Sequence, residues 1–561
     1  MRFKGLIASL VTCFILSLNM GAIAAQDKPN PKPFIMPIAQ PASASTWLFG
    51  QPYGNTTGAF NFGTAWYSAG QGLHFGIDIS MPCRTPVIAV GDAEVIYVDN
   101  LTFGAGPHNL ILRHKDAGVT TLYGHLLERP SVRQYQTVKQ GDVVGMSGDP
   151  DLTCDSRPHL HLEVRSLDYQ VTYNPVDYIN APWDALAGIG SYSRSLFEMD
   201  FNNARQWMSL YDQPPVRFGG ARLNAYAESW PLKNEDVAPQ NTAPMRPYSP
   251  LANGTWSIQP LTMDGCCAVH WWNPTNPNLL YVIDGSPGQL AGIIEWDVTA
   301  KGMTGVIENV PPMSLSPDGT YRVIRGSGQV TVRQLSSGTD YPVQTSGFPP
   351  SISPDNSHLL WEVQYGQSVP GATPLQVEIW TSNIDGSDAK QILAKPDISA
   401  RWLDGSRLLI STSDRLLTTL DVVNVVDSTS FQLGAWNNLR GLSIAPGGER
   451  IMFYQAFLPD AAMNGISVLE TQAGAQPKKL TWFGGWRWRD AQSLYYIPFD
   501  PVNGVGVMHY YDLQTGEDRA LTDPTTTPFT VANGDWSVSP DGKRIAFQNA
   551  ADRRIWIMEG Q

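Results

Sequence analysis

A short pattern recurs seven times in the second half of this chain, and it restricts the fold more than any other feature of the sequence. Clear copies are SLSPDGTYRVI (314–324), SISPDNSHLLW (351–361), LSIAPGGERIMF (442–453) and WSVSPDGKRIAF (536–547). Weaker copies are WWNPTNPNLLYVI (271–283), ARWLDGSRLLI (400–410) and WRWRDAQSLYYI (486–497). In the turn of a clear copy, proline fixes φ, aspartate caps the backbone and glycine accepts a positive φ. An alternating apolar strand follows, so each copy predicts a strand, a turn and a second strand.

The spacing of the copies indicates how these strands assemble. The copies follow one another at intervals of about 37–51 residues, which is the size of a four-stranded propeller blade. We predict a six- or seven-bladed β-propeller over residues 250–561 and favour seven blades; a β-sandwich with recurrent hairpins is the alternative. The S-P-D-G-K-x-I-A-F form of the last copy resembles the repeats of TolB-type propellers. Because long helical periodicity is scarce elsewhere, we expect an all-β dominated chain.

The first third of the chain contains a cluster of histidines. Six of the nine histidines lie between residues 74 and 161. Three short motifs hold most of them: GLHFGID (72–78), LYGHL (122–126) and RPHLHLEV (157–164). They supply His74, Asp78, His125, His159 and His161. Two imidazoles and one carboxylate can hold a zinc ion and leave its fourth position open to water, so the motifs predict a hydrolytic metal site.

The alternation in the third motif predicts a strand. Residues i and i+2 of a strand share a face, so His159 and His161 would point to one side and the intervening leucines to the other. In the first motif, His74 and Asp78 would also share a face, unless Gly76 bends the chain. The site would then be built on a β-sheet, unlike the helical HExxH arrangement. These residues alone do not distinguish metal ligands from bases.

In this order, the three motifs resemble those of the lysostaphin-type zinc endopeptidases, which hydrolyse peptide cross-links of bacterial peptidoglycan. The segments TPVIAVGDAEVIYV (85–98), NLILRH (109–114) and VKQGDVVGMSGD (138–149) agree with that family, and the resemblance covers roughly residues 45–182. It implies an antiparallel β-sheet domain that binds zinc (Zn2+) and acts on peptidoglycan peptides. It also implies that His74, Asp78 and His161 are the zinc ligands, and that His125 and His159 are the catalytic histidines.

Tyr67 is the nearest tyrosine upstream of the first implied ligand, a position that often assists catalysis in this family. The other histidines are interpreted as surface residues or satisfied core residues. They are His108, His114, His270, His358 and His509. We expect His114, which ends an apolar strand, to pack near the site without a direct role.

Four cysteines follow the N-terminal segment of the chain. Cys83 lies five residues after the aspartate of the first motif, and Cys154 lies five residues before the first histidine of the third. If the implied zinc ligands converge, these two cysteines lie close together, and an oxidising compartment permits a disulfide between them. We predict that bond; a cysteine ligand to zinc is the alternative. We expect the adjacent Cys266 and Cys267 to be two small buried thiols rather than a vicinal disulfide.

Residues 1–25 have the organisation of a secretory signal peptide. Arg2 and Lys4 precede an apolar run over residues 6–18, and small residues close the segment at Ala22 and Ala24. The run is too short for a comfortable membrane span, and nothing else in the sequence is long and apolar enough to cross a bilayer. We predict an extracytoplasmic protein, secreted or periplasmic, with no membrane span after the signal is removed.

The remaining segments and the charge complete the predicted organisation. Residues 26–44 are proline-rich and predict an extended, mobile leader. The peptidase domain would occupy residues 45–182, and residues 183–249 would form an accessory segment and linker before the propeller. The net charge of −13 argues against nucleic-acid binding, which needs a basic surface.

The function predicted from the sequence is a secreted zinc endopeptidase that hydrolyses peptide bonds of bacterial peptidoglycan. Its propeller would bind a protein or carbohydrate ligand and so position the peptidase. One alternative is a catalytically silent wall-binding or regulatory protein. Another makes the propeller the functional centre and the peptidase domain its anchor. The presence of all five site residues favours the enzyme.

Overall fold

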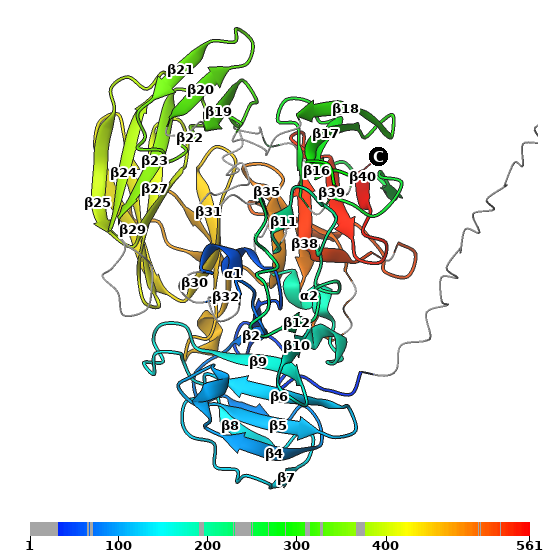
Figure 1. Ribbon diagram of the computed structural model, residues 1–561. Coiled ribbons are helices and arrows are strands. Elements are labelled where there is room, and N and C mark those ends of the chain that lie inside the picture. Colours follow the sequence, from blue (N-terminus) through cyan, green and yellow to red (C-terminus); the bar gives the residue numbers. More distant parts are fainter. Residues whose placement is uncertain are drawn as a thin grey trace, which may run out of the picture.

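In the computed structural model, the histidine motifs and the repeats belong to two different bodies, coloured blue to cyan and green to red in Figure 1. The structure describes residues 32–63, 67, 71–189, 196–227, 229–230, 248, 251–267, 269–286, 288–308, 315–325, 329–365, 376–502, 504, 506–527 and 529–560. The predicted signal peptide (1–25) and most of the predicted linker (231–247) lie outside these residues.

The first body is built on an antiparallel sheet whose main path has the strand order β1-β2-β9-β6-β5-β4-β7. These strands are β1 (Leu48–Gln51), β2 (Ile77–Ser80), β4 (Ala93–Val98), β5 (Leu110–His114), β6 (Val119–Gly124), β7 (Thr137–Val138) and β9 (His159–Ser166). β10 (Val171–Tyr173) pairs with β9 and with β12 (Val216–Arg217). β3 (Pro86–Ile88) and β8 (Val143–Met146) form a separate pair. The antiparallel sheet domain predicted for the first third of the chain is confirmed.

Alternating apolar residues explain why these segments are strands. Leu110 and Leu112 of β5 are fully buried, and so are Leu160, Leu162 and Val164 of β9. One face of the sheet therefore packs into a single hydrophobic core, while the other face of β9 presents its polar residues. His159 and His161 lie on that polar face.

Helices are few and short in the described part of the chain. They are α1 (Thr57–Asn61), α2 (Trp183–Ala187) and the 3₁₀ helices η1 (Leu101–Phe103), η2 (Pro175–Asp177) and η3 (Ala461–Met463). None of the helices among the described residues has the length and apolar character needed to cross a membrane. The expectation of an all-β dominated chain is confirmed.

The second body is a seven-bladed β-propeller, as favoured from the repeats. Six blades follow the chain order. They are β15–β18 (His270–Trp272, Leu279–Asp284, Gly292–Asp297, Gly302–Glu308), β19–β21 (Tyr321–Arg325, Val330–Gln334, Asp340–Val343), β22–β25 (Ser351–Ile352, His358–Tyr365, Gln376–Asn383, Lys390–Pro396), β26–β29 (Ile398–Trp402, Arg407–Asp414, Leu417–Asn424, Ser430–Asn437), β30–β33 (Leu439–Ile444, Arg450–Gln455, Gly465–Glu470, Lys478–Lys479) and β34–β37 (Gly484–Trp488, Ser493–Pro498, His509–Asp512, Asp518–Ala520).

The seventh blade closes the ring with strands from both ends of the propeller sequence. β38 (Val531–Val538), β39 (Arg544–Asn549) and β40 (Ile555–Gly560) form three of its strands. The fourth is β14 (Trp256–Pro260), which pairs antiparallel with β40. The propeller is therefore held shut by backbone hydrogen bonds between its first and last strands.

Three of the clear copies form the turn between two paired strands of a blade, β22 and β23, β30 and β31, or β38 and β39, and the copy at 314–324 forms the turn that precedes β19. In the last copy, Ser539 Oγ donates to Asp541 Oδ1 at 2.6 Å and accepts from the backbone amide five residues later at 2.9 Å. Ser316 and Ser353 make the same two bonds in the copies at 314–324 and 351–361. Gly542 adopts a φ of 70°, as the turn chemistry predicts.

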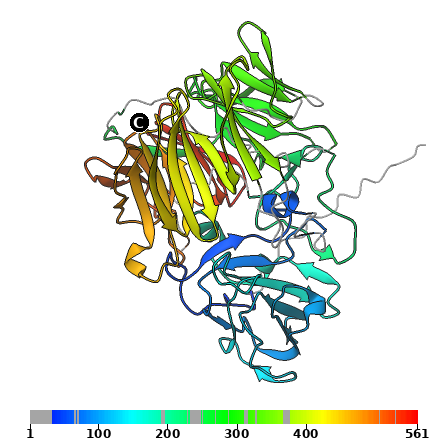
Figure 2. The same cartoon turned by 90° about the vertical axis from the view of Figure 1, so that its left-hand side faces the viewer.

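The peptidase body lies against the propeller in both views (Figures 1 and 2). α2 packs on β38 of the seventh blade. Asn533 of that blade donates its side-chain amide to Met208 O at 2.8 Å, and the Phe457 backbone amide donates to Ala44 O at 2.8 Å. Arg415 of the propeller pairs with Asp155 of the peptidase body. The two bodies are thus joined at several separate places.

Residues 32–44 differ from the extended, mobile leader that we expected there. Phe34 and Ile38 are buried, and the Ile35 amide donates to Val90 O at 3.0 Å. The Trp47 indole donates to Gln40 O at 2.7 Å. The proline content of this segment suggested a solvated chain, but its apolar residues supply enough buried surface to pack it on the peptidase domain.

The expectation for Cys266 and Cys267 was wrong. The two residues form a vicinal disulfide, with a Cα–Cα distance of 3.7 Å, between β14 and β15. Successive side chains of an extended segment point to opposite sides, but Cys267 has a φ of 60° and leaves that geometry. The local turn that brings the two sulfurs together has no signature in the sequence.

Candidate metal centre

β9 carries the paired histidines as predicted. His159 and His161 lie on its polar face, and Leu160 and Leu162 between them are fully buried in the core. Antiparallel pairing places Asp78 of β2 directly opposite His161. On the other side of β9, Gly124 at the end of β6 is also paired with His161, which brings the next residue, His125, to the same place.

His74 reaches the site from the segment that precedes β2. Its backbone forms an isolated bridge with Gly54, and the residue is 2% exposed. Gly76 lets this segment lie close to β9, because a Cβ atom there would be 2.5 Å from Leu162 O. His74 and Asp78 therefore converge through a close backbone approach that only glycine allows.

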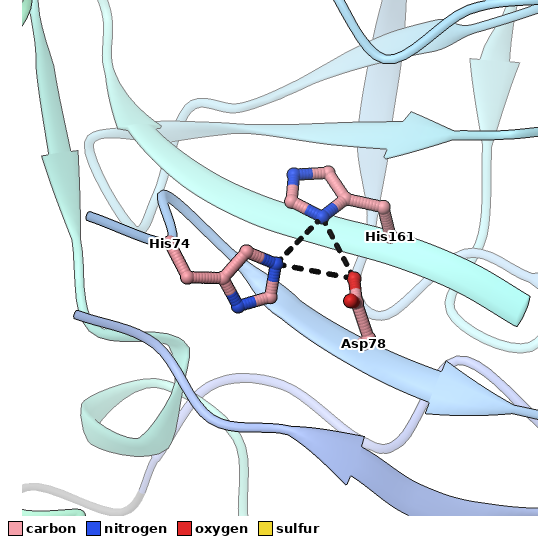
Figure 3. Close-up of side chains that lie close together, drawn as sticks. All are labelled: His74, Asp78 and His161. Atoms are coloured by element: carbon pink, nitrogen blue, oxygen red, sulfur yellow. Dashed lines mark hydrogen bonds and ion pairs between the residues drawn. The ribbon is translucent and has the colours of Figure 1, made fainter. Parts of the chain in front are cut away.

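Three potential ligand atoms meet at one point (Figure 3). His74 Nε2 lies 3.2 Å from Asp78 Oδ1 and 3.1 Å from His161 Nδ1. Asp78 Oδ1 lies 2.9 Å from His161 Nδ1. The group could therefore be a metal site, since each residue offers one ligand atom to the same small volume.

The other nitrogen of each imidazole is engaged elsewhere. His74 Nδ1 lies 2.8 Å from Pro52 O, and His161 Nε2 lies 3.0 Å from Glu163 Oε1. Both partners are acceptors, so these nitrogens carry the protons when the rings are neutral. Lone pairs then face each other and the Asp78 carboxylate. Such a set of electron-rich atoms fits a cation, and the oriented second nitrogens are typical of metal-ligating histidines.

Without a metal, a proton can supply the positive charge that these electron-rich atoms favour. Burial favours the protonated form of Asp78, but His74, His159 and His161 outweigh it and hold the pKa of this carboxyl well below its usual range. Burial opposes the charged form of His161, yet its contacts with Asp78 and Glu163 raise the pKa of its ring to about 9. Protons would therefore compete with any cation for this group.

His125 and His159 lie beside the three ligand candidates. The ring centroids of His125 and His159 are 4.7 Å apart, and His159 Nε2 is 3.7 Å from Asp78 Oδ1. His125 Nδ1 donates to Gly106 O, and His159 Nδ1 donates to Arg157 O at 2.6 Å. Burial, followed by the nearby His159 and His161, lowers the pKa of His125 to about 3. Both rings thus have Nε2 as their unprotonated atom when they are neutral.

His125 also has an unusual backbone. Its φ is 55°, in the left-handed region that few residues other than glycine adopt, and such residues cluster at functional sites. The His125 amide donates to Ala105 O at 3.0 Å. The loop at residues 105–106 therefore fixes both the backbone and the ring of this histidine.

Tyr67 stands at the edge of the group. Its ring meets the His74 ring edge-on at a centroid distance of 5.8 Å, and its hydroxyl donates to Gln51 Oε1 at 2.8 Å. Burial and the nearby Asp78 raise the pKa of Tyr67. The hydroxyl therefore stays protonated at neutral pH and acts as a hydrogen-bond donor.

The remaining histidines have other partners. His114 contacts Asp92 O at 3.0 Å and Thr121 Oγ1 at 2.9 Å, and it is buried beneath Phe34. His108 bonds to Asp99, His358 to Gly405 O, and His509 to Asp518. His270 is buried on β15. These contacts agree with the structural roles predicted for them.

A disulfide staples the rim of the site. Cys83, in the loop after β2, is bonded to Cys154 in the loop before β9, with a Cα–Cα distance of 5.8 Å. The same loop is organised by Asp149, whose carboxylate accepts from the backbone amides of Ser156 and Arg157. The predicted Cys83–Cys154 bond is confirmed.

Sequence reasoning missed two residues that extend the group. Glu163 and Arg165 follow the histidines on the same face of β9 and are 3% and 5% exposed. Charged residues at alternate positions of a strand normally indicate a solvated face, so their burial was not expected. Continuation of the period-two pattern beyond His161 was the available signal.

Comparisons with known proteins agree with this geometry. Residues 72–176 match the model of peptidase family M23. The chain is 24% identical over 215 residues to a glycyl-glycine endopeptidase of Staphylococcus capitis, a match covering 38% of this chain and 52% of that protein. It is 27% identical over 119 residues to lysostaphin of Staphylococcus staphylolyticus, covering 21% and 24%. The chain thus spans about half or less of the length of these relatives.

Among solved structures, the catalytic domain of lysostaphin from Staphylococcus simulans is similar at 24% identity and a TM-score of 0.19, covering 23% of this chain and 90% of that one. The family match contains His74, Asp78, His125, His159 and His161. Residues 72–176 accordingly form a lysostaphin-type peptidase domain of family M23, and a seven-bladed β-propeller follows it in the chain.

Proposed function

We propose that this chain is a zinc-dependent endopeptidase that hydrolyses peptide bonds of bacterial peptidoglycan. The observation that carries the proposal is the convergence of His74 Nε2, Asp78 Oδ1 and His161 Nδ1 in a domain of a metallopeptidase family. Two imidazole nitrogens and one carboxylate oxygen suit zinc and leave a coordination position for water. One relative is a glycyl-glycine endopeptidase, which supports a peptide substrate.

The chemistry divides between the metal and the two neighbouring histidines. Zinc held by His74, Asp78 and His161 would lower the pKa of water towards about 7 and so supply a nucleophile. His125 and His159 have their Nδ1–H groups held by backbone carbonyls, so the unprotonated Nε2 of each ring can accept a proton from an attacking water. Once protonated, the same atoms can hydrogen-bond a developing oxyanion and pass a proton to the leaving amine. Tyr67, at the edge of the site, supplies a further hydroxyl donor.

We further propose that the protein acts outside the cytoplasm and that its propeller binds a partner. The sequence of residues 1–25 supports export from the cytoplasm, where an oxidising environment allows the two disulfides to persist. The propeller, joined firmly to the peptidase, would hold a protein or carbohydrate partner and so bring the peptidase to its substrate. A catalytically silent wall-binding protein is the competing proposal.

Loss of turbidity of purified peptidoglycan tests the enzyme directly. We expect the exported chain to clear the suspension, and we expect a chelator or His161→Ala to abolish the clearing. His509→Ala, in a histidine that bonds to Asp518 of the propeller, is the matched control and should behave as the unmodified chain. If the unmodified chain binds zinc, the His161→Ala variant does not, and neither clears the suspension, the result would favour the silent alternative or a different peptide substrate.

A further inference from the structure

The polar face of β9 does not end at the histidines. His159, His161, Glu163 and Arg165 follow one another at every second position, so all four side chains point to the same side of the sheet. The last two are almost inaccessible to water. Burial of a charged pair is unfavourable unless its remaining hydrogen-bonding positions are also satisfied. Glu163 and Arg165 therefore need further hydrogen-bond partners.

Both oxygens of the Glu163 carboxylate are occupied. Oε1 accepts from His161 Nε2 at 3.0 Å, and Oε2 accepts from Arg165 Nε at 2.6 Å. The carboxylate therefore links a candidate metal ligand to a guanidinium in a fixed order along one strand. A neutral His161 held in this way must present Nδ1, and not Nε2, to the metal.

Arg165 is in turn tied to the other half of the site. Its NH2 group donates to Phe103 O at 3.0 Å, and its guanidinium carbon lies 4.5 Å from the ring centroid of Phe218. Phe103 ends η1, and the chain continues from it into the loop at residues 105–106 that holds His125 by its amide and its ring. Arg165 thus contacts both the residue that orients His161 and the segment that orients His125.

We propose that Glu163 and Arg165 are positioning residues of the metal centre. Glu163 sets the tautomer and ring orientation of His161, and Arg165 fixes the Glu163 carboxylate and anchors the loop that carries the His125 acceptors. The inference rests on the proposed zinc site, but it concerns residues that lie outside the set of direct ligands. A buried ion pair with a purely structural role would stabilise the sheet without affecting metal affinity.

The decisive experiment measures zinc affinity of the full chain by competition with a chromophoric chelator. Glu163→Gln keeps the shape of the side chain and removes its charge, and we expect the Kd for zinc to rise by about 10- to 100-fold. Asp490→Asn is the matched control, because Asp490 forms a similarly buried pair with Arg489 in the propeller. It should destabilise the protein while leaving the Kd for zinc unchanged.

A second readout separates geometry from stability. The visible absorption of the cobalt-substituted protein reports the arrangement of ligands around the metal, so we expect it to change in Glu163→Gln and to stay unchanged in Asp490→Asn. Should Glu163→Gln fail to fold, Arg165→Lys takes its place. Lysine keeps a positive charge beside Glu163 but cannot bond both Glu163 and Phe103 O through a planar fork, and we expect a several-fold rise in Kd.

The outcomes are distinct. An unchanged Kd and an unchanged cobalt spectrum in the folded Glu163→Gln or Arg165→Lys protein overturn the positioning role and leave the zinc site intact. If the unmodified chain binds zinc no better than His161→Ala, the zinc site itself is wrong and this inference falls with it. Weaker zinc binding in Glu163→Gln or Arg165→Lys, with unchanged binding in Asp490→Asn, supports the positioning role.

Discussion

Asp78 on β2 lies directly opposite His161 on β9, and Asp78 Oδ1 is 2.9 Å from His161 Nδ1. The contact is set by the register of two antiparallel strands and does not depend on a flexible loop. A slip of one residue would turn each side chain to the opposite face of the sheet. The core residues that alternate with His161 on β9 therefore fix the position of a candidate metal ligand.

Gly76→Ala should damage both the fold and the metal site. The added Cβ atom would meet Leu162 O at 2.5 Å, so the segment carrying His74 must move away from β9. We expect a loss of about 1–3 kcal/mol in the free energy of unfolding and weaker zinc binding, measured by denaturation and chelator competition. Gly305→Ala is the control, because nothing lies within 4 Å of a Cβ atom there. Equal effects of the two changes would contradict the close-approach argument.

His125→Asn should separate catalysis from metal binding. Asparagine tolerates the positive φ of this position but cannot transfer a proton at neutral pH. We expect the rate of peptidoglycan lysis to fall by about 10²–10⁴, with zinc content unchanged by elemental analysis. A variant that loses its zinc would instead show that His125 acts as a ligand.

Removal of the Cys83–Cys154 disulfide should destabilise the peptidase domain. The bond closes a loop with a sequence separation of 71 residues, for which the chain-entropy model gives about 4 kcal/mol. The paired Cys83→Ser and Cys154→Ser substitutions should therefore lower the denaturation midpoint. The same substitutions at Cys266 and Cys267, whose bond has a sequence separation of 1, should have a much smaller entropic effect. Similar losses in the two double variants would argue against this account.

Acid should destabilise the domain through His114, which is far from solvent. Burial lowers the pKa of His114 to about 4, below the value of about 6.5 in the unfolded chain. Between these values the unfolded state binds more protons, so stability is full above about pH 6.5 and is lost as the pH falls towards 4. The difference between the two pKa values corresponds to a loss of about 3 kcal/mol in the free energy of unfolding.

His114→Gln, which removes the titrating group, tests this pH dependence. Thermal unfolding of the unmodified protein and the variant is compared at several pH values from 4 to 7. We expect the difference between the two midpoints to vary with pH in that window. A constant difference would show that His114 does not contribute the pH dependence.

Much of the architecture could be predicted from the sequence because it follows local rules. The serine, aspartate and glycine of the repeat specify one turn, as at Ser539 and Asp541, so the number of turns predicted six or seven blades and favoured seven. The alternation of His159 and His161 with leucines specified a strand with one polar face. The roles assigned to the five site residues remain predictions, although His74, Asp78 and His161 do converge.

Other features depend on packing between distant segments, which local patterns do not contain. The burial of Glu163 and Arg165 results from segments around Phe103 and Phe218 that cover the end of β9. Residues 32–44 pack because the peptidase domain offers them an apolar surface next to Phe34. The vicinal disulfide requires the backbone angle of Cys267, which neighbouring sequence does not encode in a recognisable form.

The pairing of β14 with β40 means that the propeller closes only after its last strand has been synthesised. β40 ends at Gly560 and β14 begins at Trp256, so the ring cannot close until residues 555–560 have been synthesised. α2, which adjoins the peptidase domain, packs on β38 of the same blade. The blade that closes the ring is therefore also one of the places where the propeller holds the peptidase body, and a chain interrupted before β38 would lack both the closed ring and this contact.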